Sequence, residues 1–106
     1  MNFYELENIE IKEPVKGYKG KFIHSENQTI AIWDVDKGAV LPEHKHKHEQ
    51  ISAVVEGEFE LTINGESRKV DNNSVAVIPS NVPHSGIAVT KCKIIDIFYP
   101  IREEYK

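Results

Sequence analysis

Apolar and polar side chains alternate over several short segments of the chain, as expected for β-strands that bury one face. In residues 58–64, Phe59, Leu61 and Ile63 share one face while the other face is polar. Residues 28–35 show the same period of two. The pattern predicts further strands over 67–70, 75–78, 84–90 and 92–99.

Turn residues separate these segments. Asn64-Gly65 is the strongest hairpin signal because both residues tolerate positive φ, and further turns are predicted at 71–74 and 79–83. No segment has an apolar period of 3.6 residues long enough for a helix, so residues 101–106 are expected to form one helical turn or to stay extended. Short strands at regular spacing predict an all-β sandwich or barrel.

Composition narrows the range of functions. A chain of 106 residues is long enough for one core and too short for two, so we expect a single domain over residues 1–106. The net charge of −4 and the scattered basic residues argue against a nucleic-acid or membrane-surface protein. No signal sequence or membrane-length apolar stretch is present, so a cytoplasmic protein is expected. The single cysteine, Cys92, cannot form an internal disulfide and is expected to be a small strand residue.

Three of the five histidines alternate with lysines in one short run. In a strand, His44 and His46 would face the same way about 6.6 Å apart, close enough to bind one ion. Gln50 would lie roughly 20 Å from His44 along a straight strand, so it joins them only if residues 47–49 bend. His48 would then lie on the bend or behind it. The alternative interpretation is a polar strand that carries solvated histidines.

The spacing of these residues resembles the first motif of the cupin family. That motif reads Gly, five residues, His-x-His, three or four residues, Glu, six residues, Gly. Gly38, His44, His46 and Gly57 fit it, and Gln50 stands where Glu is usual. The resemblance implies a single cupin barrel, also called a double-stranded β-helix or jelly roll, with a metal ion inside its mouth.

A second cupin motif reads Gly, five residues, Pro-x-Gly, two residues, His, three residues, Asn. Pro79 and His84 fit it. Asn73 and Asn81 occupy the two glycine positions, and asparagine is among the residues that best tolerate positive φ. Ala88 stands where the final Asn is usual, so this position is left out of any site. Two motifs in register make the resemblance specific.

The resemblance implies that one divalent ion binds to His44, His46, Gln50 and His84. All four ligands are neutral, so the full charge of the ion stays in the site and attracts an anionic substrate. The ligands do not choose among nickel, zinc, manganese and iron. The missing carboxylate ligand favours hydrolytic, hydration or isomerisation chemistry over redox chemistry. His24 stands apart and is expected at the surface or at a pocket edge.

Residues 92–99 place Asp96 among apolar side chains in a strand that must be largely buried. A buried carboxylate needs a partner or has a raised pKa, and both suit a general acid or base. Phe98 points the same way as Asp96, and Arg102 follows Pro100, from where it could reach back across the barrel mouth. The alternative is a structural carboxylate that caps backbone donors or faces solvent.

The run His-x-His-x-His-Glu-Gln and the ending Asp-x-Phe-x-Pro-x-Arg-Glu are similar to those of KdgF-type cupins of pectin and alginate breakdown. Those enzymes open 4,5-unsaturated uronate monosaccharides to linear 5-keto sugars. The resemblance therefore implies a small anionic sugar as substrate and catalytic roles for Asp96, Phe98 and Arg102. A metal-dependent dioxygenase, a sugar-isomerase relative and a non-catalytic sugar-binding cupin remain alternatives. Small cupins are commonly homodimers, and an exposed barrel edge favours a homodimer here.

Overall fold

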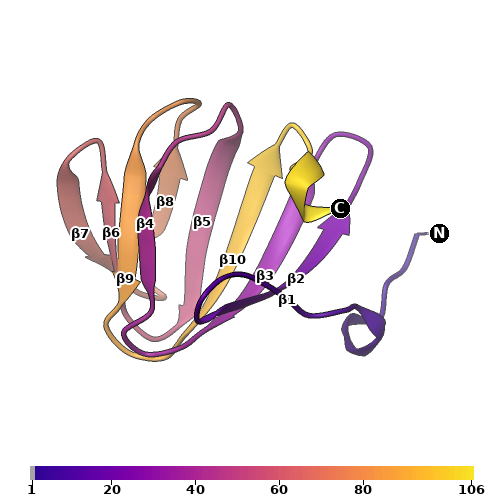
Figure 1. Cartoon of the computed structure of the whole chain (residues 1–106), viewed down its shortest axis with the longest axis horizontal. Helices are drawn as coiled ribbons and strands as arrows, with labels where there is room; N and C mark the ends of the chain where they lie inside the picture. The colour runs from indigo at the N-terminus through magenta and orange to yellow at the C-terminus, as the bar shows by residue number, and fades with distance from the viewer. Residues whose placement is uncertain (1) are drawn as a thin grey trace.

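The computed structural model describes residues 2–106, which form two antiparallel sheets and two short 3-10 turns (Figure 1). The six-stranded sheet has the order β1 (Lys12–Val15), β2 (Tyr18–His24), β3 (Thr29–Val35), β10 (Cys92–Tyr99), β5 (Glu49–Glu56), β8 (Val75–Ile78). The four-stranded sheet has the order β4 (Val40–His44), β9 (His84–Ala88), β6 (Phe59–Ile63), β7 (Glu66–Val70). The turns are η1 (Leu6–Asn8) and η2 (Glu103–Tyr105). No helix within residues 2–106 is long and apolar enough to cross a membrane.

The strands predicted from alternation are confirmed, with ends that differ by at most two residues. Alternation sets no bounds for strands before residue 28 or between residues 38 and 57, where β1, β2, β4 and β5 lie. The one helical turn at the end of the chain is also present, as η2.

The two sheets face each other as in a double-sheet jelly roll (Figure 1). Within the described part of the chain, no strand of one sheet pairs with a strand of the other. The all-β jelly-roll prediction is confirmed, but the ladder of hydrogen bonds does not run continuously around a closed barrel. The sheets are held together by side chains and by the loops that cross between them.

Side chains from both sheets meet in one hydrophobic core. Trp33 and Ile94 come from the larger sheet, and Phe59 and Leu61 come from the smaller one. Gly86 on β9 lies against the ring of Phe59, which occupies the space where a Cβ atom would project. The glycine therefore makes room for a core aromatic ring on the neighbouring strand β6.

Asparagines at two turns adopt the left-handed conformation that the sequence predicts. Asn64 and Gly65 have φ of 49° and 83°, which confirms the hairpin between β6 and β7. Asn81 has φ of 62° in the second glycine position of the cupin motif. The same expectation is wrong for Asn73, which is not among the positive-φ residues of the described chain. Its amide N–H instead bonds Oδ1 of Asp71 at 2.9 Å, a turn that needs no left-handed residue.

Candidate metal centre and adjoining pocket

Three histidines converge between the sheets at the ends of β4 and β9. β4 ends at His44 and β9 begins at His84, and the two residues pair directly across the strands. Their ring centroids are 4.3 Å apart, and the ring of His46 lies 5.6 Å from His44 and 4.9 Å from His84. One ligand atom from each residue lies within 4.8 Å of the others. The three side chains could therefore hold one metal ion.

Backbone carbonyls orient all three rings. The Nδ1 atoms of His44 and His84 lie 2.8 and 2.9 Å from the carbonyl oxygens two residues before them. Nδ1 of His46 lies 2.9 Å from the carbonyl oxygen two residues after it. A carbonyl only accepts, so each Nδ1 carries the hydrogen and each Nε2 keeps its lone pair. Nε2 of His46 and of His84 is buried with no partner in residues 2–106, and such unpaired acceptors fit a metal ion.

The environment of His46 and His84 keeps these two imidazoles in the form that binds metal. Burial, together with the positive charge of Arg102, lowers the pKa of His46 to about 4. Burial also lowers the pKa of His84. A metal competes with protons for the ring nitrogen, so a neutral imidazole near pH 7 favours binding.

The path of the chain around His46 differs from the predicted one. The sequence places His44 and His46 on one strand face, but β4 ends at His44 and His46 lies in the connection to β5. That connection bends at Lys47 and His48, so the predicted reversal of the chain is present. The bend, not the period of a strand, turns His46 toward the other two rings.

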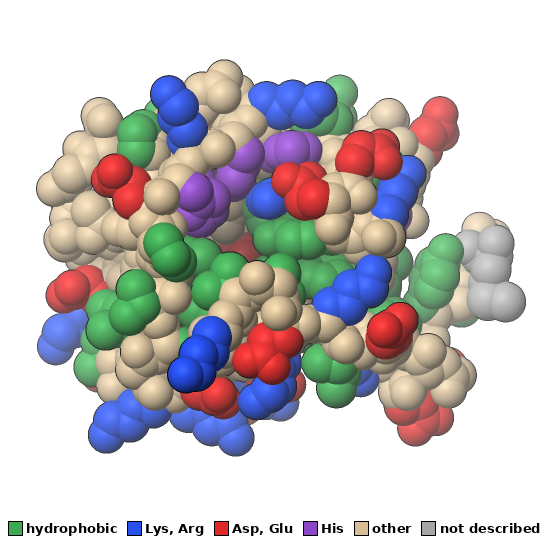
Figure 2. Space-filling view, viewed as in Figure 1, with side chains coloured by type: hydrophobic (Ala, Val, Ile, Leu, Met, Phe, Trp, Pro, Cys, Tyr) green, Lys and Arg blue, Asp and Glu red, His purple; other side chains and the backbone are tan. Residues whose placement is uncertain are grey.

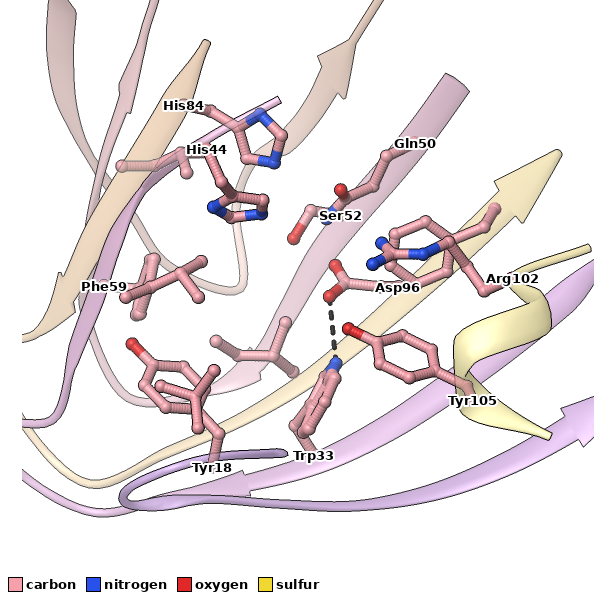
Figure 3. Close-up of a pocket in the computed structure, with 15 residues that line it drawn as sticks. Tyr18, Trp33, His44, Gln50, Ser52, Phe59, His84, Asp96, Arg102 and Tyr105 are labelled. Carbon is pink, nitrogen blue, oxygen red and sulfur yellow. Dashed lines mark hydrogen bonds between the residues drawn. The ribbon is translucent and has the colours of Figure 1, made fainter. Parts of the chain in front are cut away.

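Gln50 follows the bend as the second residue of β5. Its side chain is buried and lines the same pocket as His44 and His84. Figure 3 shows the amide on the side of the pocket that faces these rings. Its position is therefore compatible with the predicted role of a fourth ligand, which stays a prediction.

The two remaining histidines lie outside this cluster. Nε2 of His48 lies 3.1 Å from the carbonyl oxygen of Ile101, so this ring holds the C-terminal segment. His24 is half-buried, with Nδ1 2.8 Å from Oγ1 of Thr29 and Nε2 3.2 Å from the carbonyl oxygen of Tyr105. Both residues attach the end of the chain to the sheet rather than contributing to the cluster.

Asp96 lies on β10, at the centre of the larger sheet, with its side chain toward the core. Nε1 of Trp33 donates a 3.0 Å hydrogen bond to Oδ2 of Asp96 (Figure 3). Oδ1 is buried without a hydrogen-bond partner of suitable geometry among the described residues. Burial raises the pKa of the carboxyl, although the polar groups of Ser52, Gln50 and Trp33 and the charge of Arg102 oppose the rise. The prediction of a buried acid is confirmed.

Arg102 lies between two aromatic rings next to this acid. The carbon of its guanidinium is 4.7 Å from the ring centroid of Phe98 and 4.5 Å from that of Tyr105. Its Nη2 pairs with Oε2 of Glu104 at 3.1 Å. The arginine side chain is only 9% exposed and that of Glu104 is 52% exposed. Nε of Arg102 is buried and has no partner in the part of the chain that the structure describes.

Residues 31–98 match the protein family described as the cupin domain. The chain belongs to the cupin family. Over 92 residues it is 34% identical to the pectin degradation protein KdgF of Dickeya dadantii (strain 3937), with 84% of each chain covered.

Two solved structures are similar to this cupin over nearly its full length. An RmlC-like cupin from Shewanella frigidimarina NCIMB 400 has a TM-score of 0.93 and 30% identity, covering 100% of this chain and 96% of its own. KdgF from Halomonas sp. has a TM-score of 0.91 and 28% identity, and the match covers 99% of this chain and 100% of that one. The predicted resemblance to KdgF-type cupins is confirmed.

The pocket of this cupin joins the histidines to the acid and the arginine. Figure 2 shows histidine side chains along one side of a hollow that is lined with hydrophobic side chains. His44, Gln50, Asp96 and Arg102 all line one pocket. The sequence-predicted residues are thus brought together.

Sequence reasoning missed Tyr105 as part of this pocket. Its ring stacks on Phe22 at 4.3 Å and packs edge-on against Trp33 at 5.9 Å, which anchors it to the core. Figure 3 shows its hydroxyl on the side of Asp96. A polar chain end with one tyrosine carries no local signal for this role, because the contacts depend on where the last turn folds.

Proposed function

We propose that this cupin binds one divalent metal ion through His44, His46, Gln50 and His84 and opens the ring of a 4,5-unsaturated uronate. One arrangement carries the proposal: a buried acid and a nearly buried guanidinium share a pocket with the histidine cluster. The relative in Dickeya dadantii is a pectin degradation protein, which supports a sugar acid as substrate.

Four neutral ligands leave the charge of the ion uncompensated. The ion supplies Lewis acidity and attraction for an anionic group. Imidazole nitrogens suit nickel, zinc and iron, and the amide oxygen of Gln50 suits manganese, so the proposal extends to this group of metals.

Arg102 binds the substrate carboxylate in this proposal. Its Nε–H is buried without a partner among residues 2–106, so this donor is available to a ligand. A guanidinium held between the rings of Phe98 and Tyr105 is fixed in direction, which suits a two-pronged contact with a carboxylate. Phe98 also offers an apolar surface to the sugar ring.

Asp96 moves the proton. The substrate is a cyclic enol ether, so Asp96 gives a proton to C4 and the oxygen of a water molecule bonds to C5. That water returns a proton to Asp96 and leaves a hemiketal. The bond from C5 to the ring oxygen then breaks as the C5 hydroxyl loses its proton and the ring oxygen gains one, which yields the ketone at C5 and a hydrated aldehyde at C1. Loss of water from C1 makes the overall reaction an isomerisation. Burial raises the pKa of Asp96, as a general acid near neutral pH requires.

Turnover of an unsaturated uronate, followed by loss of its ultraviolet absorbance, tests the proposal. Asp96→Asn should keep the fold and the metal but reduce kcat by on the order of 10²–10⁴. Asp34→Asn is the matched control, because Asp34 is an exposed carboxylate on β3 and should leave kcat unchanged. Binding of the uronate without its consumption by the metal-loaded wild-type protein would instead assign a sugar-binding role.

Three wider predictions belong to this proposal: one domain over residues 1–106, a cytoplasmic location and a homodimer. The match of 100% of the chain to 96% of a single cupin chain supports the first. Limited proteolysis would test the single domain, cell fractionation would test the location, and the mass in solution would test the homodimer.

A further inference from the structure

His48 is the one buried residue in the connection 45–48 between β4 and β5, and it is only 5% exposed. Its backbone carbonyl accepts a 2.9 Å hydrogen bond from Nδ1 of the candidate ligand His46. Its ring Nε2 donates a 3.1 Å hydrogen bond to the carbonyl oxygen of Ile101. Nδ1 of the ring then keeps its lone pair, and it is buried with no partner among residues 2–106. The ring therefore makes its polar contact in the described chain with Ile101.

The carbonyl of Ile101 belongs to the peptide group that precedes Arg102. The N–H of the same peptide group donates a 2.9 Å hydrogen bond to Oγ1 of Thr29, a fully buried residue of β3. His48 thus holds one polar group of this peptide and Thr29 holds the other. A peptide group is planar, so fixing both of these groups sets the direction in which the next side chain leaves the backbone. That side chain carries the guanidinium beside Asp96 in the pocket (Figure 3).

The bend that contains His48 is itself held by the loop that leads into β9. The backbone N–H of Asn81 donates a 2.7 Å hydrogen bond to the carbonyl of His46. Oγ of Ser80 donates a 2.6 Å hydrogen bond to the carbonyl of Lys47. These bonds join the two loops next to the histidine cluster, so the backbone on the N-terminal side of His48 is fixed. The ring of His48 connects this fixed backbone to the C-terminal segment.

We propose that His48 is a positioning residue that holds Arg102 at a set place relative to the metal ion. The proposal rests on the role proposed above for Arg102 as the group that binds a carboxylate. Among the described residues, those that line the pocket include Arg102 but not His48, so His48 acts through the arginine. Hydrogen bonds behind the binding groups determine how closely these groups are placed. The arrangement selects an anion whose carboxylate meets the guanidinium while another of its oxygens faces the histidines.

Calorimetry of galacturonate binding to the zinc-loaded full chain tests this proposal. Galacturonate carries the uronate carboxylate but no 4,5 double bond, so binding is measured without turnover. His48→Leu removes the donor to Ile101 and should raise the dissociation constant on the order of tenfold. His48→Ala removes the same donor, so it gives a second variant if the leucine disturbs folding.

His48→Gln is the conservative variant. Its amide nitrogen can replace Nε2 as the donor to Ile101, so the affinity for galacturonate should stay near the wild-type value. All three variants keep a backbone carbonyl at position 48 for Nδ1 of His46, so each should still contain one zinc ion per chain.

Two further measurements separate positioning from a general loss of stability. In the Arg102→Ala background, His48→Leu should cause no further loss of affinity, because the group that it positions is already absent. Val70→Ala is the matched control. Val70 is a core residue at the end of β7 and is not among the described residues that line the pocket. Its truncation should lower stability and leave the affinity for galacturonate unchanged.

Unchanged affinity in His48→Leu and His48→Ala, or an equal loss in Val70→Ala, would overturn the proposal. An equal loss in His48→Gln would do the same, because the donor would then not be what matters. A further loss from His48→Leu in the Arg102→Ala background would show that His48 does not act through the arginine. Failure of the wild type to bind galacturonate would also overturn this proposal. The proposed ring opening is judged separately, by turnover of the unsaturated uronate.

Discussion

Trp33 donates the hydrogen of its indole Nε1 to Oδ2 of Asp96 across 3.0 Å, and this bond joins the aromatic core to the polar wall of the pocket. The two residues are on adjacent strands of the larger sheet, β3 and β10, and both face inward. One carboxylate oxygen is thereby held by the core, while the other lacks a hydrogen-bond partner among residues 2–106.

Burial raises the pKa of Asp96 above its ordinary value of 3.8, and this makes stability depend on pH. Between 3.8 and the raised value, the folded protein binds more protons than the unfolded chain, so the contribution of Asp96 to stability falls as pH rises. In the metal-free protein, Asp96→Asn should therefore gain free energy of unfolding relative to wild type by up to ~1.4 kcal/mol per pH unit in that window. Denaturant titrations of both proteins from acid to neutral pH measure this difference in the free energy of unfolding. A difference that does not vary with pH would contradict the raised pKa.

Removal of two converging histidines should remove the metal. The double variant His46→Ala, His84→Ala should contain almost no divalent metal by elemental analysis. His48→Ala should keep a full ion, since His48 lies outside the cluster, but should be destabilised by about 1–3 kcal/mol because the carbonyl of Ile101 loses its donor. Equal metal content in the double variant and the wild type would rule out the assigned ligands.

Metal uptake should release few protons near pH 6. The pKa of His46 is lowered to about 4, so that ring is already neutral there, and the lowered pKa of His84 shifts that ring toward its neutral form. We expect fewer protons per ion than the roughly two that three histidines of ordinary pKa would release. Calorimetry in buffers of different ionisation enthalpy counts these protons. Affinity should fall as pH approaches 4, and release of two or more protons at pH 6 would refute the lowered pKa values.

Tyr105 should act on anionic ligands through Arg102. Arg102→Ala should raise KM for the uronate on the order of tenfold or more with a smaller effect on kcat, since the carboxylate is bound in both ground and transition states. Tyr105→Leu should also raise KM, because the guanidinium of Arg102 loses one of the two rings that hold it. Tyr105→Phe keeps that ring, so its KM should stay near the wild-type value. In the Arg102→Ala background, Tyr105→Leu should add little. Full additivity of the two changes would contradict the coupling.

Much of the fold could be predicted because its signals are local. A side-chain period of two and the turn at Asn64-Gly65 are properties of neighbouring residues, and they placed six of the ten strands of the described chain within two residues of their observed ends. His84 was linked to His44 and His46 only by the resemblance to the two cupin motifs, and the structure brings these three residues together.

By itself, the sequence determined which residue types are available for chemistry: the histidines, the buried Asp96 and the arginine that follows it. The tertiary structure alone decided how they are held. Pairing of β4 with β9 brings His44 against His84, the bend at Lys47 and His48 turns His46 inward, and η2 folds Tyr105 onto Arg102. These contacts join residues that are far apart in the chain or beyond its last strand. Their energies depend on burial and on the shape of neighbouring elements, which no local pattern encodes.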